Sequence, residues 1–211
     1  MNWPVAVNRK NLDHAASLLR AGGVVAFPTE TYYGLAVDPF NPQALERLFF
    51  VKHRPRRLPI LVLVAGTDQL PLLTGKVPAV YGRLIDCFWP GPLTLVCPAL
   101  PLLPSQLTGK TGTIALRHSP HETANALIVA FDGPITATSA NITGFPAAVT
   151  AEEVARIFDS EIDLILDGGP TPGGSGSTLV GIDKGTLFCI REGKIGFSAV
   201  QDCTAALALH D

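Results

Sequence analysis

Four positively charged side chains crowd into one short segment of the chain. Lys52, Arg54, Arg56 and Arg57 are four of its sixteen lysine and arginine residues, and they lie within six positions. Arginine offers a planar fork of donors and lysine a point charge, a combination that suits a polyphosphate. A basic turn at a helix C-terminus explains Lys52 and Arg54, but it does not explain four cations in a chain of net charge -2. The segment therefore predicts an anion site.

Hydroxyl groups and glycines gather in three other segments, at residues 28–35, 137–144 and 173–178. Such residues let a ligand approach the backbone closely, although a turn whose threonines bond to their own backbone explains residues 28–35 equally well. Arg117 ends a predicted strand just before a helix, where it could hold a phosphate or carboxylate or form an ordinary surface ion pair. Neither the P-loop pattern nor the dinucleotide fingerprint occurs, so a nucleotide would need a different architecture.

The sequence offers little sign of a metal centre or a disulfide framework. His118 and His121 lie three positions apart, but no third ligand accompanies them, so we predict no metal site. The cysteines are far apart and form no C-x-x-C pair, which predicts reduced and mostly buried thiols. They are Cys87, Cys97, Cys189 and Cys203.

Composition and apolar runs bound the class of protein. With 47% hydrophobic and 16% charged residues, the chain can bury a sizeable core. Its net charge of -2 argues against a protein wrapped in nucleic acid by bulk electrostatics. Residues 87–109 carry no charge, but their prolines would break a lipid-exposed helix several times. No secretory signal is visible at the N-terminus. We therefore expect a soluble, cytoplasmic protein without a membrane segment.

Apolar periodicity and capping residues predict alternating helices and strands. Helices are predicted at residues 11–21, 41–51, 78–88, 120–130 and 150–158. Strands are predicted at residues 24–27, 59–64, 93–97, 113–116, 134–137, 162–166, 177–180, 186–191 and 194–197, the last two joined by a tight turn at residues 192–193. This order predicts an α/β fold, and the late run of strands predicts a mixed sheet. No linker or repeat divides the chain, so we expect one domain over residues 1–211.

Taken in order, the polar segments resemble those of the YrdC-like family, whose best-understood members are threonylcarbamoyl-AMP synthases. The resemblance covers about residues 12–197. It is carried by Pro28-Thr29-Glu30-Thr31 with Tyr33-Gly34-Leu35, Lys52-x-Arg54-Pro55 with Pro59, Trp89-Pro90-Gly91-Pro92-Leu93-Thr94, Arg117, Thr138-Ser139-Ala140-Asn141 with Gly144, Ser177-Thr178 and Arg191-Glu192-Gly193. One such element would be weak evidence for the family, whereas the full set in matching order and spacing is highly specific.

The resemblance implies a YrdC-like fold, in which a twisted open mixed sheet with flanking helices lines a deep electropositive groove. It also implies a single-domain member with a short C-terminal tail. The implied reaction joins L-threonine and bicarbonate to the AMP part of ATP and releases pyrophosphate. The product, threonylcarbamoyl-AMP, would pass to a separate transferase complex for tRNA N6-threonylcarbamoyladenosine (t6A) modification next to the anticodon. ATP would enter as a substrate with Mg²⁺ held mainly by its phosphates, and weak tRNA binding is allowed.

The matching residues take their expected roles from this resemblance and from the anions that the reaction gathers. A carbamate is already an anion, so the site needs positioning and charge compensation more than a general base. Lys52 and Arg54 are expected to be catalytic, at the phosphates and the developing charge. The residues expected at the threonine and carbamate pocket are Thr29, Thr31, Tyr33, Arg117 and Ser177. Those expected to bind ATP are Lys52, Arg54, Thr138, Ser139, Asn141 and Arg191.

Three features depart from the family pattern. Gly181 stands where the family usually has an aspartate, and Arg117 is followed by His-Ser-Pro instead of an apolar residue and proline. The glycine-rich residues 170–176 could form a lid or a loose loop. Two other functions stay open: an RNA-binding module without catalysis, and a paralogue that uses a different carbamoyl-adenylate substrate.

Overall fold

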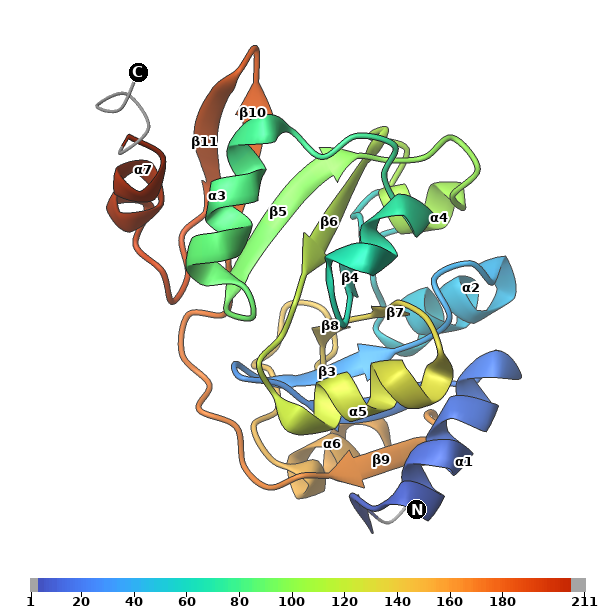
Figure 1. The fold of residues 1–211 in the computed structure, drawn as a ribbon. Coiled ribbons are helices and arrows are strands. Elements are labelled where there is room, and N and C mark those ends of the chain that lie inside the picture. The colour runs from blue at the N-terminus through green and yellow to red at the C-terminus, as the bar shows by residue number, and fades with distance from the viewer. Residues whose placement is uncertain (1–3, 206–211) are drawn as a thin grey trace.

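The computed structural model describes residues 4–205 and folds them into two mixed sheets with helices on their faces (Figure 1). This confirms the predicted mixed α/β fold, although the strands divide between two sheets instead of forming one. The five-stranded sheet lies in the lower half of Figure 1 and the six-stranded sheet in the upper half. Within the described residues, no helix combines the length and the apolar character that a membrane crossing requires.

The five-stranded sheet has the order β1–β9–β2–β3–β8. Its strands are β1 (Val5–Ala6), β2 (Val25–Pro28), β3 (Tyr33–Ala36), β8 (Thr138–Ser139) and β9 (Leu164–Asp167). β1, β9 and β2 run parallel, whereas β3 runs antiparallel to β2 and β8. Successive side chains of β2 point to opposite faces, so Ala26 joins one hydrophobic core and Phe27 the other. Both faces of this sheet are therefore covered.

Four helices provide this cover, and all four were predicted. α1 (Arg9–Arg20) and α5 (Glu122–Phe131) pack together in the core that contains Phe27. α2 (Pro42–Val51) and α6 (Ala151–Phe158) contribute to the core that contains Ala26. Side-chain caps fix where both of these begin, because Asn41 accepts hydrogen bonds from the first turn of α2 and Thr150 from that of α6.

The six-stranded sheet has the order β11–β10–β5–β6–β4–β7. Its strands are β4 (Leu61–Leu63), β5 (Leu93–Pro98), β6 (Thr113–Arg117), β7 (Ile135–Thr136), β10 (Thr178–Asp183) and β11 (Thr186–Arg191). α3 (Ala79–Phe88) packs on it, and the buried Tyr81 hydroxyl donates to the Val96 carbonyl of β5 at 2.9 Å. The connections contain the short helices η1 (Thr67–Leu72) and α4 (Ser105–Thr108), which the sequence analysis did not predict.

One continuous segment joins the two sheets. β7 pairs with β4 of the six-stranded sheet, and directly afterwards β8 pairs with β3 of the five-stranded sheet. Between these pairings, the Ala137 amide donates to the Leu61 carbonyl at 2.8 Å. The crossing therefore fixes residues 138 and 139 where the two sheets meet.

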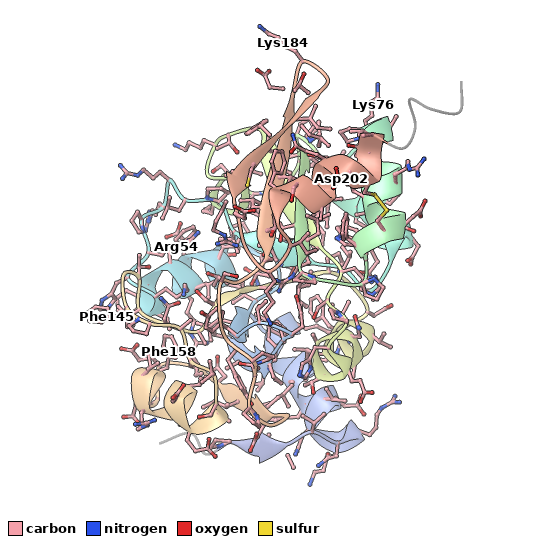
Figure 2. All side chains as sticks on the ribbon, turned by 90° about the vertical axis from the view of Figure 1, so that its left-hand side faces the viewer. Arg54, Lys76, Phe145, Phe158, Lys184 and Asp202 are labelled. Atoms are coloured by element: carbon pink, nitrogen blue, oxygen red, sulfur yellow. A yellow bond between two sulfur atoms is a disulfide. The ribbon has the colours of Figure 1, made fainter. Side chains whose placement is uncertain are left out.

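The C-terminal part differs from the prediction. Residues 194–197 form no strand. The Gly193 and Ile195 amides donate instead to the Thr178 hydroxyl at 2.9 and 3.1 Å, and Gly193 lies so close to β10 that a Cβ there would be 2.4 Å from the Ser177 carbonyl carbon. The chain then enters α7 (Phe197–Ala205). Because residues 194–197 are not a strand, the hairpin predicted around residues 192–193 does not form. A different hairpin joins β10 and β11, and its turn lies at Lys184 and Gly185, both with positive φ. Figure 2 shows Lys184 at the tip of this hairpin.

The prediction of four reduced thiols is wrong for two of them. Cys87 of α3 and Cys203 of α7 form a disulfide across 116 residues of sequence, which Figure 2 shows as a yellow bond beside α7. Spacing in the sequence could not reveal the pair, because it is the packing of an unpredicted helix on α3 that brings the two residues together. Cys97, which is buried, and Cys189 are free.

Candidate functional site

A cavity of about 460 Å³ lies where the two sheets meet. Its walls come from β3, β4, β6, β8, β10 and β11, from the loop before β3 and from the loop after α2. Most of the predicted site residues line it: Thr29, Thr31, Tyr33, Arg54, Arg117, Thr138, Ser139, Ser177 and Arg191. The other two, Lys52 and Asn141, do not. Segments from widely separated parts of the sequence therefore converge on one space.

Three arginines line the cavity, and no carboxylate of the described residues does. Arg54 is held in place by its Nη2, which donates to the Pro59 carbonyl at 2.8 Å, while its buried Nε has no partner among the described residues. Burial lowers the pKa of Arg54, but a guanidinium still stays charged at neutral pH. Arg56, from the same sequence cluster, pairs instead with Glu46 and does not line the cavity. Of the four cations predicted to form an anion site at residues 52–57, only Arg54 lines the cavity.

Arg117 ends β6 with its side chain almost fully enclosed. The residue is 5% exposed, and its Nη1 lies 3.3 Å from Glu30 Oε1. Burial lowers the pKa of Arg117, Glu30 raises it, and Arg191 lowers it again. Its Nε is buried and has no partner among the described residues. A buried N–H without an acceptor calls for an explanation, and a carboxylate or phosphate bound in the cavity would supply one.

Ser177 faces the cavity as a hydrogen-bond donor. Its Oγ accepts from Thr94 Oγ1 at 2.9 Å and from Arg191 Nη2 at 3.3 Å. These two bonds use the lone pairs of the hydroxyl, so its own proton remains free to donate. Arg191 is held there by a second bond to the Ser177 carbonyl at 2.9 Å. This part of the wall therefore presents positive charge and a donor together.

Thr31, unlike Ser177, presents a hydrogen-bond acceptor to the cavity. Thr29 Oγ1 donates to the Tyr32 carbonyl at 2.8 Å and lies 3.0 Å from Thr31 Oγ1. Because the Thr29 proton is used, Thr31 must donate to Thr29, and only the lone pairs of the Thr31 oxygen remain available. Thr31 therefore offers the cavity an acceptor, which suits an ammonium, amine or hydroxyl of a ligand.

The glycine-rich segment at residues 168–176 is tied to the cavity wall. The Tyr33 hydroxyl donates to the Gly169 carbonyl at 2.8 Å, and the Tyr32 hydroxyl donates to the Gly174 carbonyl. Burial raises the pKa of Tyr33 above its usual range, so this hydroxyl remains a donor. These bonds favour a segment held over the cavity, in place of a loose loop.

Lys52 lies behind the cavity wall. It is 1% exposed, and its Nζ donates to the Ser139 carbonyl, to the Asn141 carbonyl at 2.8 Å and to Asn141 Oδ1 at 3.3 Å. Burial first, and then the charge of Arg54, lowers the pKa of Lys52 to about 7. Asn141 Oδ1 also accepts from Ser139 Oγ at 2.6 Å, and its Nδ2 donates to two carbonyls of the next loop. The arrangement suits holding residues 139–141 in place; direct contact of Lys52 with a phosphate stays a prediction.

Gly181, where the resemblance led us to expect an aspartate, lies beneath an aromatic ring. A Cβ at this position would be 2.6 Å from the Phe188 ring and 3.2 Å from Ile190 Cδ1. The Phe188 ring therefore occupies the space into which an aspartate side chain would project. Gly181 does not line the cavity.

Glu30 contacts Arg117 but was not among the predicted site residues. The signal was present in the sequence, because Glu30 is the one acid within residues 28–35 and an ion pair was one of the two alternatives left open for Arg117. What the sequence could not reveal was that the loop before β3 lies against the end of β6, although the two are almost ninety residues apart.

Comparisons with known proteins agree with this geometry. The family model Sua5_yciO_yrdC, described as "Telomere recombination", matches residues 17–193. A threonylcarbamoyl-AMP synthase from Pyrococcus abyssi is 37% identical over 196 residues, which are 93% of this chain and 58% of that protein. One from Bacillus subtilis is 40% identical over 192 residues, which are 90% of this chain and 56% of that protein. The chain thus spans a little more than half the length of these relatives.

A solved structure resembles this chain over nearly its whole length. The crystal structure of P. abyssi Sua5 complexed with L-threonine matches it with a TM-score of 0.90 at 36% identity. The match covers 95% of this chain and 59% of the P. abyssi chain.

Proposed function

Because this chain belongs to the Sua5/YciO/YrdC family, we propose that it joins L-threonine, bicarbonate and ATP into threonylcarbamoyl-AMP and releases pyrophosphate. Both relatives are named threonylcarbamoyl-AMP synthases, and P. abyssi Sua5 has been solved with L-threonine. The observation that carries the proposal is the convergence of three arginines on a cavity whose described lining has no carboxylate. A lining of this kind supports the proposed electropositive groove, which would attract anionic reactants.

The reaction asks for little acid–base chemistry from the protein. The amine nitrogen of threonine bonds to the carbon of bicarbonate, and water leaves. An oxygen of the resulting carbamate attacks the α-phosphorus of ATP. The bond from this phosphorus to the bridging oxygen breaks, and pyrophosphate departs with the electron pair. The protein must therefore gather anions, align them and compensate for their charge.

The donors and acceptors of the cavity fit these reactants. We assign Arg54, whose Nε lacks a partner, to the phosphates and the charge that develops on them. Arg117 and Ser177 are donors and suit the carboxylate of threonine or of its carbamate. Thr31 is an acceptor and suits the amine or the hydroxyl of threonine.

The remaining predicted residues take nucleotide-binding or supporting roles in this proposal. Thr138, Ser139 and Arg191 line the cavity and are assigned to the nucleotide. Thr29 accepts the proton of the Thr31 hydroxyl and so leaves Thr31 as an acceptor. Tyr33 holds the glycine-rich segment through the Gly169 carbonyl. Lys52 and Asn141 act from behind the wall, by holding Ser139.

The lining residues also bear on the metal ion that accompanies ATP. Mg²⁺ prefers carboxylate and phosphate oxygens, and the described lining contains no carboxylate to hold it. We therefore assign Mg²⁺ to the phosphate oxygens and water, so that it would enter with the nucleotide.

The product is a mixed anhydride of a carbamic acid and a phosphate, which is reactive toward nucleophiles. We propose that a separate transferase complex accepts it in the cytoplasm and transfers the threonylcarbamoyl group to adenosine next to the anticodon of tRNA. Weak binding of tRNA by this chain would assist that transfer.

Exchange of labelled pyrophosphate into ATP tests the proposed function. Exchange is expected only when L-threonine and bicarbonate are both present, because the carbamate is the nucleophile. Exchange in the absence of either would contradict the proposal. No exchange, together with salt-sensitive binding of RNA, would favour the RNA-binding alternative.

Replacing Thr31 tests the polarity argument. Thr31→Val keeps the shape but removes the acceptor, so KM for L-threonine is expected to rise about 10- to 100-fold, the scale of one hydrogen bond to a charged group. KM for ATP is expected to stay nearly constant. Thr31→Ser retains the hydroxyl and serves as the matched control. Equal KM values for threonine in the two variants would contradict the assignment.

A further inference from the structure

We propose that Glu30 is a positioning residue, which holds the Arg117 guanidinium so that its unpartnered N–H faces the substrate carboxylate. Arg117 lines the cavity, whereas Glu30 lines a neighbouring hollow of about 430 Å³. The arginine therefore lies between the substrate space and this carboxylate. The inference rests on the proposed function, because it assigns a carboxylate-bearing substrate to Arg117.

Glu30 is itself fixed at two points, its carboxylate and its backbone carbonyl. Its Oε2 accepts from the hydroxyl of Ser119, which is fully buried. Its backbone carbonyl accepts from Lys194 Nζ at 2.7 Å. Glu30 thus joins the loop before β3 to residues that follow β6 and β11. An anchor held in this way can fix the direction of the guanidinium that it contacts.

Charge balance explains why Arg117 needs such an anchor. Burial of an unpaired guanidinium is costly, and Arg191 adds repulsion from the same cavity wall. Within the described residues, Glu30 is the carboxylate in ion-pair range of Arg117. The contact is a single ion pair at 3.3 Å without hydrogen-bond geometry, since Glu30 Oε1 has no hydrogen-bond partner among the described residues. A bidentate pair would instead use two parallel hydrogen bonds. Glu30 therefore holds Arg117 without using up its donors.

Binding of L-threonine and of pyrophosphate can distinguish a positioning role of Glu30 from a purely electrostatic one. A carboxylate that accepts from a guanidinium depends on the direction of the N–H groups, whereas pyrophosphate is attracted mainly by total positive charge. Glu30→Gln preserves size and an acceptor for Ser119 but removes the negative charge that fixes Arg117. The loss of a negative charge also makes the cavity more positive. L-Threonine should therefore bind more weakly, and pyrophosphate should bind at least as tightly.

Isothermal titration calorimetry of L-threonine and of pyrophosphate measures both effects. In Glu30→Gln, Kd for L-threonine is expected to rise about 10-fold, the scale of one well-aligned charged hydrogen bond, while Kd for pyrophosphate stays within about twofold or falls. Ser119→Ala keeps the negative charge of Glu30 but removes the hydroxyl that holds its carboxylate. A smaller rise in Kd for L-threonine is therefore expected. Glu122→Gln is the matched control, because Glu122 lines the same hollow and has no ion pair with Arg117.

The outcomes distinguish this inference from the proposed function. If wild-type protein binds L-threonine and Glu30→Gln binds it equally well, or if both ligands weaken together, the positioning role is wrong while the proposed function stands. If the wild type binds no L-threonine, the proposed function fails and the inference fails with it. Thermal unfolding of each variant shows whether it is folded. Should Glu30→Gln not fold, an unchanged threonine affinity in Ser119→Ala overturns the inference.

Discussion

Replacement of Arg54 by alanine is expected to lower the rate of adenylate formation by about 10²-fold or more, the scale of losing one preorganised charged donor. Arg54 lines the cavity, and its Nε has no partner within residues 4–205. In the proposed reaction it compensates for charge that grows on the phosphates as pyrophosphate leaves. The loss should therefore appear mainly in kcat. Single-turnover measurement of threonylcarbamoyl-AMP formation records it.

Arg56→Ala provides the matched control for this experiment. Arg56 lies two positions away, but its side chain is 76% exposed, pairs with Glu46 and does not line the cavity. Its removal is expected to change the rate by less than about twofold, as for most exposed ion pairs. If Arg54→Ala and Arg56→Ala had the same rate, the cavity would not be the site of phosphate chemistry. Figure 2 shows Arg54 in the loop that follows α2.

Replacement of Lys52 by methionine is expected to cost both activity and stability. Lys52 Nζ satisfies two carbonyls and the Asn141 side-chain oxygen behind the cavity wall. Methionine would leave these buried acceptors unpaired, which lowers the free energy of unfolding by about 1–3 kcal/mol. Because Ser139 would lose its support, adenylate formation is expected to fall at least about tenfold. Denaturant unfolding and single-turnover rates measure the two losses.

The pH dependence of stability follows from the burial of Lys52. Its pKa is about 7 in the folded protein and 10.5 in an ordinary environment. Between these values the unfolded chain binds a proton that the folded chain does not, so the free energy of unfolding rises with pH in this window. Lys52→Met lacks this contribution. The difference in unfolding free energy, wild type minus variant, should therefore increase from the lower to the upper end of the window.

Lys184→Met is the control for both measurements, because Lys184 lies at the tip of the β10–β11 hairpin. It should match the wild type in activity and in the slope of stability with pH. A flat wild-type-minus-variant difference for Lys52→Met would show that this lysine keeps its charge in the folded protein. Full activity in Lys52→Met would remove Lys52 from the site altogether.

The parts of the fold that could be predicted are those with local causes. α2 and α6 begin where predicted because Asn41 and Thr150 cap them within a few residues. β8 has two residues and was not predicted, since its existence depends on pairing with β3 more than a hundred residues away. The strand expected at residues 194–197 fails for a similar reason, because hydrogen bonds from the Gly193 and Ile195 amides to the Thr178 hydroxyl override a local pattern that suits a strand.

For the candidate site, the residue types could be predicted from the sequence, but the directions in which the side chains point could not. Arg54 and Arg117 stood out as cations at the ends of elements, and both line the cavity. Lys52 stood out for the same reason, yet it points behind the wall, because a sequence gives the order of residues but not which side of a wall a side chain takes. Glu30 was missed since its partner is set by the meeting of two sheets.

The most direct test of the account is incubation of the protein with ATP, L-threonine and labelled bicarbonate. Label is expected in a compound that also contains AMP, in an amount equal to the pyrophosphate released, and omission of threonine should abolish it. Pyrophosphate release with no labelled nucleotide, or the same labelled product without threonine, would contradict the claim that this cavity unites the three reactants.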